Sequence, residues 1–121
     1  MAASYLEASL DRLGAPVQRD DTIEICINPD GQVWGEFQGD HFMRSLGMPL
    51  TQTEIKDLGN QIASAASTTL STKKPIVSVS ILYRDRPIRA QVIQPPAVEG
   101  GFSISLRFFS SLPLEAIRLG F

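Results

Sequence analysis

A strand pattern that stops at two prolines and restarts after two glycines limits the possible folds of this chain more than any other feature. Residues 88–94 read as a strand, and residues 95–96, both proline, must end it because proline has no amide hydrogen for a sheet ladder. The glycines at 100–101 then permit the chain to reverse. In residues 102–108, Ser and Arg alternate with large apolar residues, as in a half-buried strand. The stretch therefore predicts two neighbouring strands.

Each of these strands carries an arginine, Arg89 in the first and Arg107 in the second. Two arginines on neighbouring strands can face one anion together. They can equally be solvated charges at the edge of a sheet, and spacing alone favours this second interpretation. The two residues are the candidate anion site of the sequence.

The bulk properties of the chain indicate one ordinary globular domain. Its 121 residues, 43% of them apolar, are enough to bury a core. The net charge of −2 argues against electrostatic capture of nucleic acid or anionic lipid. No apolar run reaches the roughly 18 residues of a membrane span, and the start has no hydrophobic signal segment. The single cysteine, Cys26, fits a reducing compartment, so we expect a cytoplasmic protein.

The hydrophobic periodicities predict an α+β fold with a roughly six-stranded, mostly antiparallel sheet and two or three helices. The sheet should contain a three-stranded meander, a hairpin and a final strand. The expected elements are a helix over 4–13, strands over 22–27, 32–37 and 41–44, a helix over 52–69, strands over 77–82, 88–94 and 102–108, and a helix from about residue 112.

Local signals set some of these boundaries. Ser4 with Glu7, and Thr51 with Glu54, have the spacing of a capping box, in which each side chain binds a free backbone amide at a helix start. Residues 28–31, Asn-Pro-Asp-Gly, form a turn signal because proline presets one backbone angle and glycine accepts a positive φ. We therefore expect the first two strands to form a hairpin.

Catalytic and metal-binding patterns are absent from the sequence. It contains no phosphate-binding loop of the type Gly-x-x-x-x-Gly-Lys-Ser/Thr. His41 and Cys26 are the only residues of their kinds, which argues against a zinc site or a Ser-His-Asp triad. We expect His41 to be a surface or packing residue. We assign no catalytic residue and no metal ligand, and expect no enzymatic activity from this chain alone.

Aromatic and basic residues admit two interpretations. Trp34 lies close in sequence to Phe37 and Phe42, and such a group usually packs in a core or a subunit interface. The middle of the chain has a positive bias, which usually marks a solvated hairpin face and less often binds nucleic acid. The residues of this bias are Lys73, Lys74, Arg84, Arg86 and Arg89.

Three separated blocks of the chain resemble the N-terminal domain of the traffic ATPases of type IV secretion and conjugation, within the wider secretion-ATPase superfamily. Residues 22–34, TIEICINPDGQVW, are similar to the family's TEIxINxPGEVW hairpin. Residues 74–76 leading to 89–96, RAQVIQPP, are similar to its RVQIVxPP, and residues 103–107, SISLR, to its SxSIRK. The segment 114–121 looks like the start of the family's linker. The blocks occur in the family's order and cover most of the chain.

The resemblance implies a larger assembly than the chain itself could show. The whole protein would be a homohexameric ATPase at the cytoplasmic side of the bacterial inner membrane, in contact with other secretion components. Residues 1–112 would be its N-terminal domain, and residues 113–121 would begin a linker to an absent RecA-like domain. ATP and Mg²⁺ would bind between the two domains, and Arg89 and Arg107 match the family positions that approach the nucleotide.

Two departures from the family pattern affect this assignment. The family usually has Gly-Glu where this chain has Pro87-Ile88, and a second basic residue where it has Phe108. These changes alter the hairpin tip and remove a charge. Two rival hypotheses therefore stay open: a non-enzymatic adaptor module of a secretion machine, and a nucleic-acid-binding domain that uses the basic hairpin.

Overall fold

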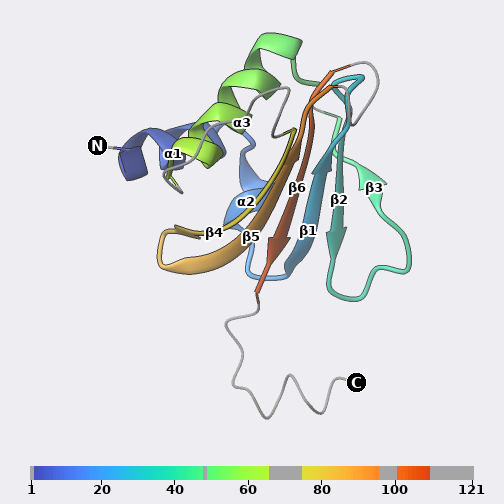
Figure 1. Cartoon of the computed structure of the whole chain (residues 1–121). Helices are drawn as coiled ribbons and strands as arrows, with labels where there is room; N and C mark the ends of the chain where they lie inside the picture. Colours follow the sequence, from blue (N-terminus) through green and yellow to red (C-terminus); the bar gives the residue numbers. More distant parts are fainter. Residues whose placement is uncertain (1, 48, 66–74, 96–100, 110–121) are drawn as a thin grey trace.

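The computed structural model describes residues 2–47, 49–65, 75–95 and 101–109 (Figure 1). It has three helices and one six-stranded sheet in which every neighbouring pair is antiparallel, in the order β3-β2-β1-β6-β5-β4. The predicted α+β class is confirmed. The elements are α1 (Ala2–Asp11), α2 (Ala15–Gln18), β1 (Thr22–Ile27), β2 (Val33–Phe37), β3 (Arg44–Ser45), α3 (Gln52–Ala65), β4 (Ile76–Tyr83), β5 (Arg86–Ile93) and β6 (Ser103–Phe108).

The core lies between the helices and one face of the sheet. Figure 1 shows the three helices gathered on this side, and β1 and β6, which are far apart in sequence, side by side in the middle of the sheet. Leu10 of α1 and Ile62 of α3 are fully buried against strand residues such as Ile25 and Leu106. Because strand side chains alternate between faces, the polar residues between these apolar ones lie on the opposite side, which we call the open face.

Several local predictions are confirmed. Thr51 and Glu54 form the reciprocal capping box: the Thr51 amide donates to the Glu54 carboxylate at 2.9 Å, and the Glu54 amide donates to the Thr51 hydroxyl at 3.1 Å. The turn between β1 and β2 closes with a hydrogen bond from the Gly31 amide to the Asn28 carbonyl at 2.9 Å, and Gly31 has a φ of 90°. The other capping prediction is wrong, because α1 begins before Ser4.

Other boundaries differ from the sequence prediction. The third strand of the meander is only Arg44–Ser45, while residues 41–43 have no regular structure. The short helix α2 was not predicted; proline occupies its first turn, where a missing amide hydrogen does no harm. The expected helix from residue 112 and the end of the expected 52–69 helix lie outside the described residues.

The β4–β5 hairpin is tighter than expected. Its turn contains only Arg84 and Asp85, which have positive φ angles of 49° and 66°. Positive φ at both central residues is the geometry that matches the twist of a two-residue hairpin, and it usually requires Asn or Gly. Arg86 therefore belongs to β5 and not to a loop, and this places its side chain against the body of the domain.

Candidate functional site

Arg89 and Arg107 stand directly opposite each other on adjacent strands. The β5–β6 register pairs the two residues, so both side chains project from the same face of the sheet, from Cα atoms about 5.5 Å apart as in a hydrogen-bonded antiparallel pair. Both residues are exposed on the open face. Like charges directly opposite each other destabilise an antiparallel pair. The arrangement therefore has an electrostatic cost that a bound anion would remove.

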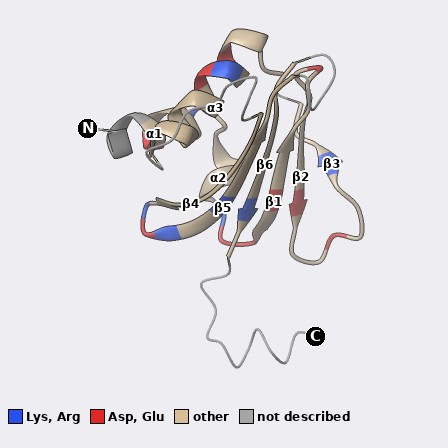
Figure 2. Cartoon of the chain, viewed as in Figure 1, with Lys and Arg blue, Asp and Glu red and all other residues tan. Residues whose placement is uncertain are grey.

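The two arginines line a shallow hollow of about 430 Å³ on the open face. The other lining residues are polar, and they come from β1, β4, β5 and β6: Glu24, Ser78, Gln91 and Ser105. Arg107 lies 3.8 Å from the Glu24 carboxylate across the β1–β6 pair. Figure 2 shows this alternation of charge, with a basic segment on β6 beside acidic segments on β1 and β2. No hydrogen bond or ion pair of the Arg89 side chain is found among the described residues.

Glu24 connects the arginine hollow to the only cysteine. The Cys26 thiol donates to the Glu24 carboxylate at 3.1 Å, and the Ser105 hydroxyl lies 3.4 Å from the same oxygen. Partial burial, followed by the neighbouring Glu24 carboxylate, raises the pKa of the Cys26 thiol to about 11. The thiol is therefore neutral at physiological pH, and Glu24 supplies the single negative charge of the hollow.

We expect Cys26 to react slowly with iodoacetamide at pH 8, because the thiolate is the reacting form. The rate should be at least about tenfold lower than in the urea-unfolded chain, and Glu24→Gln should increase it. The folded state holds this proton more tightly than the unfolded state. Its contribution to stability is therefore complete below the ordinary thiol pKa of 9.0 and is lost as pH rises through about 11. Equal alkylation rates in the folded and unfolded chain would contradict this assignment.

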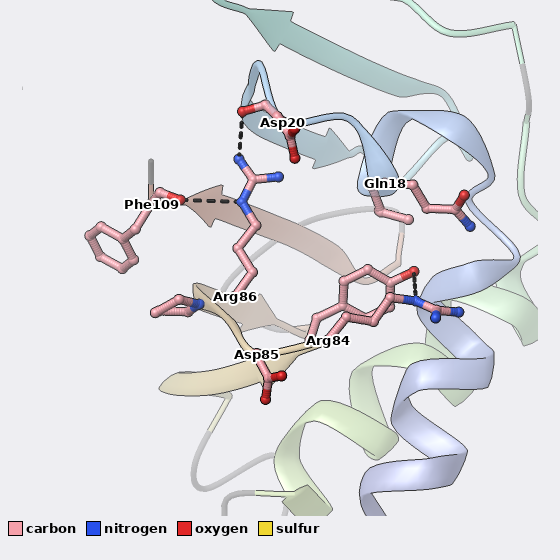
Figure 3. Close-up of a pocket in the computed structure, with 9 residues that line it drawn as sticks. Gln18, Asp20, Arg84, Asp85, Arg86 and Phe109 are labelled. Carbon is pink, nitrogen blue, oxygen red and sulfur yellow. Dashed lines mark hydrogen bonds between the residues drawn. The ribbon is translucent and has the colours of Figure 1, made fainter. Parts of the chain in front are cut away.

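A second hollow, of about 540 Å³, lies beside the β4–β5 turn (Figure 3). It also contains two arginines, but both are committed to contacts within the domain. The Arg84 guanidinium binds both oxygens of Asp11 at 3.0 and 3.1 Å and donates to the Tyr83 hydroxyl at 3.2 Å. Hydrogen bonds from Tyr83 and then Arg84 lower the pKa of Asp11. Arg84 is therefore neutralised by a carboxylate.

Arg86 fixes the hairpin to the rest of the domain. Its guanidinium donates to the backbone carbonyls of Arg19 at 2.7 Å, Thr22 at 3.0 Å, Phe109 at 3.2 Å and Asp20 at 3.3 Å. Figure 3 shows the side chain extended between the segment before β1 and the end of β6. These contacts give it a structural role, so the hollow by the turn is a poorer anion site than the one at Arg89 and Arg107.

The sequence interpretation of the basic and aromatic residues needs correction. Arg84 is exposed, as expected for a solvated hairpin face, although it is paired with the Asp11 carboxylate. Arg86 is not solvated in this way, because it is partly buried and binds backbone carbonyls. Lys73 and Lys74 lie outside the described residues. Trp34 is half-buried on the open face and is not part of the core, whereas His41 is exposed as predicted. A basic stripe for nucleic acid is therefore not formed by the described part of this group.

No group of His, Cys, Asp or Glu in the described ranges could hold a metal ion. No helix in the described part of the chain is long and apolar enough to cross a membrane. The arginine hollow on the open face is thus the strongest candidate site in these ranges.

Comparison with known proteins gives matches only among solved structures. No protein-family model matches the chain, and no curated protein matches it. The chain is similar to the VirB11 ATPase from the Brucella suis type IV secretion system in complex with sulphate, with 22% identity and a TM-score of 0.71 over 99% of this chain and 36% of that one. It is also similar to the pilus retraction motor PilT with bound ADP, with 17% identity and a TM-score of 0.55 over 91% of this chain and 34% of that one.

The similarity agrees with the resemblance of the sequence blocks to secretion ATPases. The chain spans only about a third of the length of either solved protein. Across nearly its whole length, this chain has a fold that occurs as part of the VirB11 secretion ATPase.

Proposed function

We propose that this chain is the N-terminal, ring-forming and nucleotide-clamping domain of a hexameric type IV secretion ATPase. The whole protein would power transport of protein or DNA, or pilus assembly, at the cytoplasmic side of the inner membrane. Supporting this proposal are the sequence blocks, the fold shared with VirB11, and the weaker likeness to the PilT motor. The solved VirB11 structure contains sulphate and the PilT structure contains ADP, both of which are anions.

The observation that carries the proposal is the opposed pair of Arg89 and Arg107. A guanidinium group stays charged and donates paired hydrogen bonds in a planar fork, which suits phosphate oxygens. Without an anion, the two guanidinium charges repel each other, so a bound phosphate would reduce this repulsion and attract both groups. Functional sites are where a fold tolerates such a local conflict.

The neighbours of the pair set the expected strength of binding. Glu24 offsets part of the positive charge through its contact with Arg107, which leaves roughly one net positive charge in the hollow. Ser78, Gln91 and Ser105 add polar groups that can bind sugar or phosphate oxygens. The hollow is open, so water competes for these groups. We expect weak binding by this chain alone, with a Kd on the order of 1 mM.

The chain would hold and orient nucleotide without hydrolysing it. It has no phosphate-binding loop, and its described residues contain no cluster of metal ligands. Catalysis would require the RecA-like domain, which would also bring the Mg²⁺ that neutralises the phosphates. Arg89 and Arg107 would then act from the opposite side of the nucleotide.

Nuclear magnetic resonance of the isotope-labelled chain tests this proposal. Addition of ATP or ADP should shift backbone amides of β5 and β6 around the two arginines, whereas adenosine should leave these amides unchanged. The effect should weaken with added salt because it depends on exposed charges. Shifts confined to the hollow by the β4–β5 turn, or no shifts at all, would favour the adaptor hypothesis. Salt-dependent binding of an oligonucleotide without nucleotide binding would favour the nucleic-acid hypothesis.

A further inference from the structure

Within the described residues, β4 is an edge strand whose own sequence has none of the charges or prolines that normally protect an edge. It has eight residues, Ile76–Tyr83, none of them charged and none of them proline. In the described sheet, β5 is its only neighbouring strand (Figure 1). Natural edge strands are usually short or carry charges, prolines or bulges that block pairing with another chain. The other edge strand of this sheet, β3, has only two residues. The length and neutrality of β4 therefore stand out.

The hydrogen-bonding pattern shows which residues of β4 face outward. The Gln94 amide donates to the Pro75 carbonyl at 2.9 Å, and these two residues continue the β4–β5 register. Antiparallel pairs alternate between residues that exchange hydrogen bonds and residues that do not. Every second residue after Pro75 therefore binds β5, and the residues between them direct their amides and carbonyls to the free edge. The outward-directed residues are Ile76, Ser78, Ser80 and Leu82.

The same four residues have exposed side chains on the open face. Ile76 and Leu82 are 48% and 63% exposed, which is unusual for large aliphatic residues on a strand. The two serines lie between them. Among the described residues, no other strand pairs with these outward-directed backbone groups, and the two apolar side chains beside them are exposed.

We propose that β4 pairs antiparallel with β4 of a second copy of this chain, about a two-fold axis through Val79. This register matches outward-directed residues only with each other, as a hydrogen-bonded ladder requires. It also places the two exposed aliphatic residues against each other. The resulting pairs are Ile76 with Leu82, Val77 with Ile81, Ser78 with Ser80, and Val79 with its own counterpart.

The chemistry of the strand explains why a second copy is the occupant. The strand is self-complementary about Val79, with aliphatic residues at both ends and serines on either side of the axis. A two-fold contact uses the same surface on both copies and closes after two subunits. Rings of identical subunits close through head-to-tail contacts, which differ from a two-fold contact, so this inference does not rest on the proposed function. A strand pair is smaller than a standard stable interface, and we expect a Kd on the order of 100 µM.

Cysteine cross-linking tests the register directly, in a Cys26→Ser background. Two Val79→Cys side chains would face each other in a non-hydrogen-bonded pair with Cα atoms about 4.5 Å apart, close enough for a disulfide. Leu82→Cys is the matched control. Its side chain is more exposed, but the two copies would lie six residues apart, about 20 Å. Mild oxidation should link Val79→Cys and leave Leu82→Cys monomeric. The opposite preference, or no link in either variant, would overturn the proposal.

Charge substitution tests association independently by sedimentation equilibrium. Ser78→Lys/Ser80→Lys and Ser78→Glu/Ser80→Glu each place like charges opposite each other and should weaken dimerisation at least about tenfold. A mixture of the two variants should recover it, because Lys then faces Glu. Thr53→Lys/Asn60→Lys adds the same charges to exposed positions of α3 and should dimerise as the original chain does. A mixture that stays monomeric, or an original chain that stays monomeric at about 500 µM, would contradict the pairing.

Discussion

Replacement of Arg86 by alanine is expected to lower the free energy of unfolding by about 2–4 kcal/mol. The side chain donates to four backbone carbonyls, those of Arg19, Asp20, Thr22 and Phe109. These bonds join β5 to the segment before β1 and to the end of β6. Truncation leaves the carbonyls without their charged donor, and hydrogen bonds to a charged group are each stronger than neutral ones. The guanidinium also lies 4.9 Å from the centre of the Phe108 ring, a contact that alanine removes.

Urea unfolding followed by circular dichroism measures this effect. Arg86→Lys keeps the charge but has no planar fork, so it should lose an intermediate amount of stability. Lys56→Ala, at an exposed position of α3, is the control for loss of one cation and should change stability by less than about 0.5 kcal/mol. An Arg86→Ala variant as stable as Lys56→Ala would show that the four bonds contribute little.

The sequence predicted the strands well because their periodicity is a local property. Glu24–Ile27 and Ser103–Phe108 alternate between buried apolar and more exposed residues, and burial of one sheet face produces this pattern. The alternation fails at the start of β1, where the register shifts between Thr22 and Glu24 and the polar Thr22 is buried. The capping box at Thr51 and Glu54 was predictable for the same reason, since both partners lie within one turn of the chain. The strand predicted over residues 41–44 was mostly wrong, because so short a segment contains too few apolar residues to show a reliable period.

The site depended on strand pairing, which the sequence does not specify. Arg89 faces the same side as Arg107 only in the observed register, and a shift of one residue would place them on opposite faces. The contact of Glu24 with Arg107 arises because the first and last strands are neighbours. No local sequence pattern indicates that two strands so far apart in the chain will be neighbours. The arginine pair could therefore be suggested from the sequence, whereas its neutralising carboxylate could not.

The role of Arg86 was missed for a different reason. The Arg84-Asp85 turn lacks the Asn-Gly signature of a two-residue hairpin, so the sequence placed Arg86 in a connecting loop. Its hydrogen-bond acceptors are backbone carbonyls, which carry no side-chain signal. The sole indication of its structural role in the sequence was its position next to the start of a predicted strand.

Removal of either arginine of the pair should weaken ATP or ADP binding about tenfold, because a charge-assisted hydrogen bond in an open site is worth about 1.5 kcal/mol. The same substitutions should leave stability unchanged or raise it slightly. Arg89→Ala removes a like-charge contact and breaks no bond among the described residues. Arg107→Ala also ends the 3.8 Å contact with Glu24, which as an exposed ion pair contributes little. If the two arginines served only to stabilise the fold, their substitution by alanine would lower the stability instead.

Nucleotide titration tests most directly the central claim that the arginine pair binds nucleotide. Affinity and thermal unfolding are measured on the same samples of three variants, Arg89→Ala, Arg107→Ala and Arg44→Ala. Arg44 is exposed on β3, the edge strand that pairs with β2, so Arg44→Ala removes one positive charge at a place away from the hollow. We predict weaker nucleotide binding in the first two variants, at unchanged or higher melting temperature, and near-original binding in the third. Equal affinity in all three variants would contradict the assignment of the arginine pair to nucleotide binding.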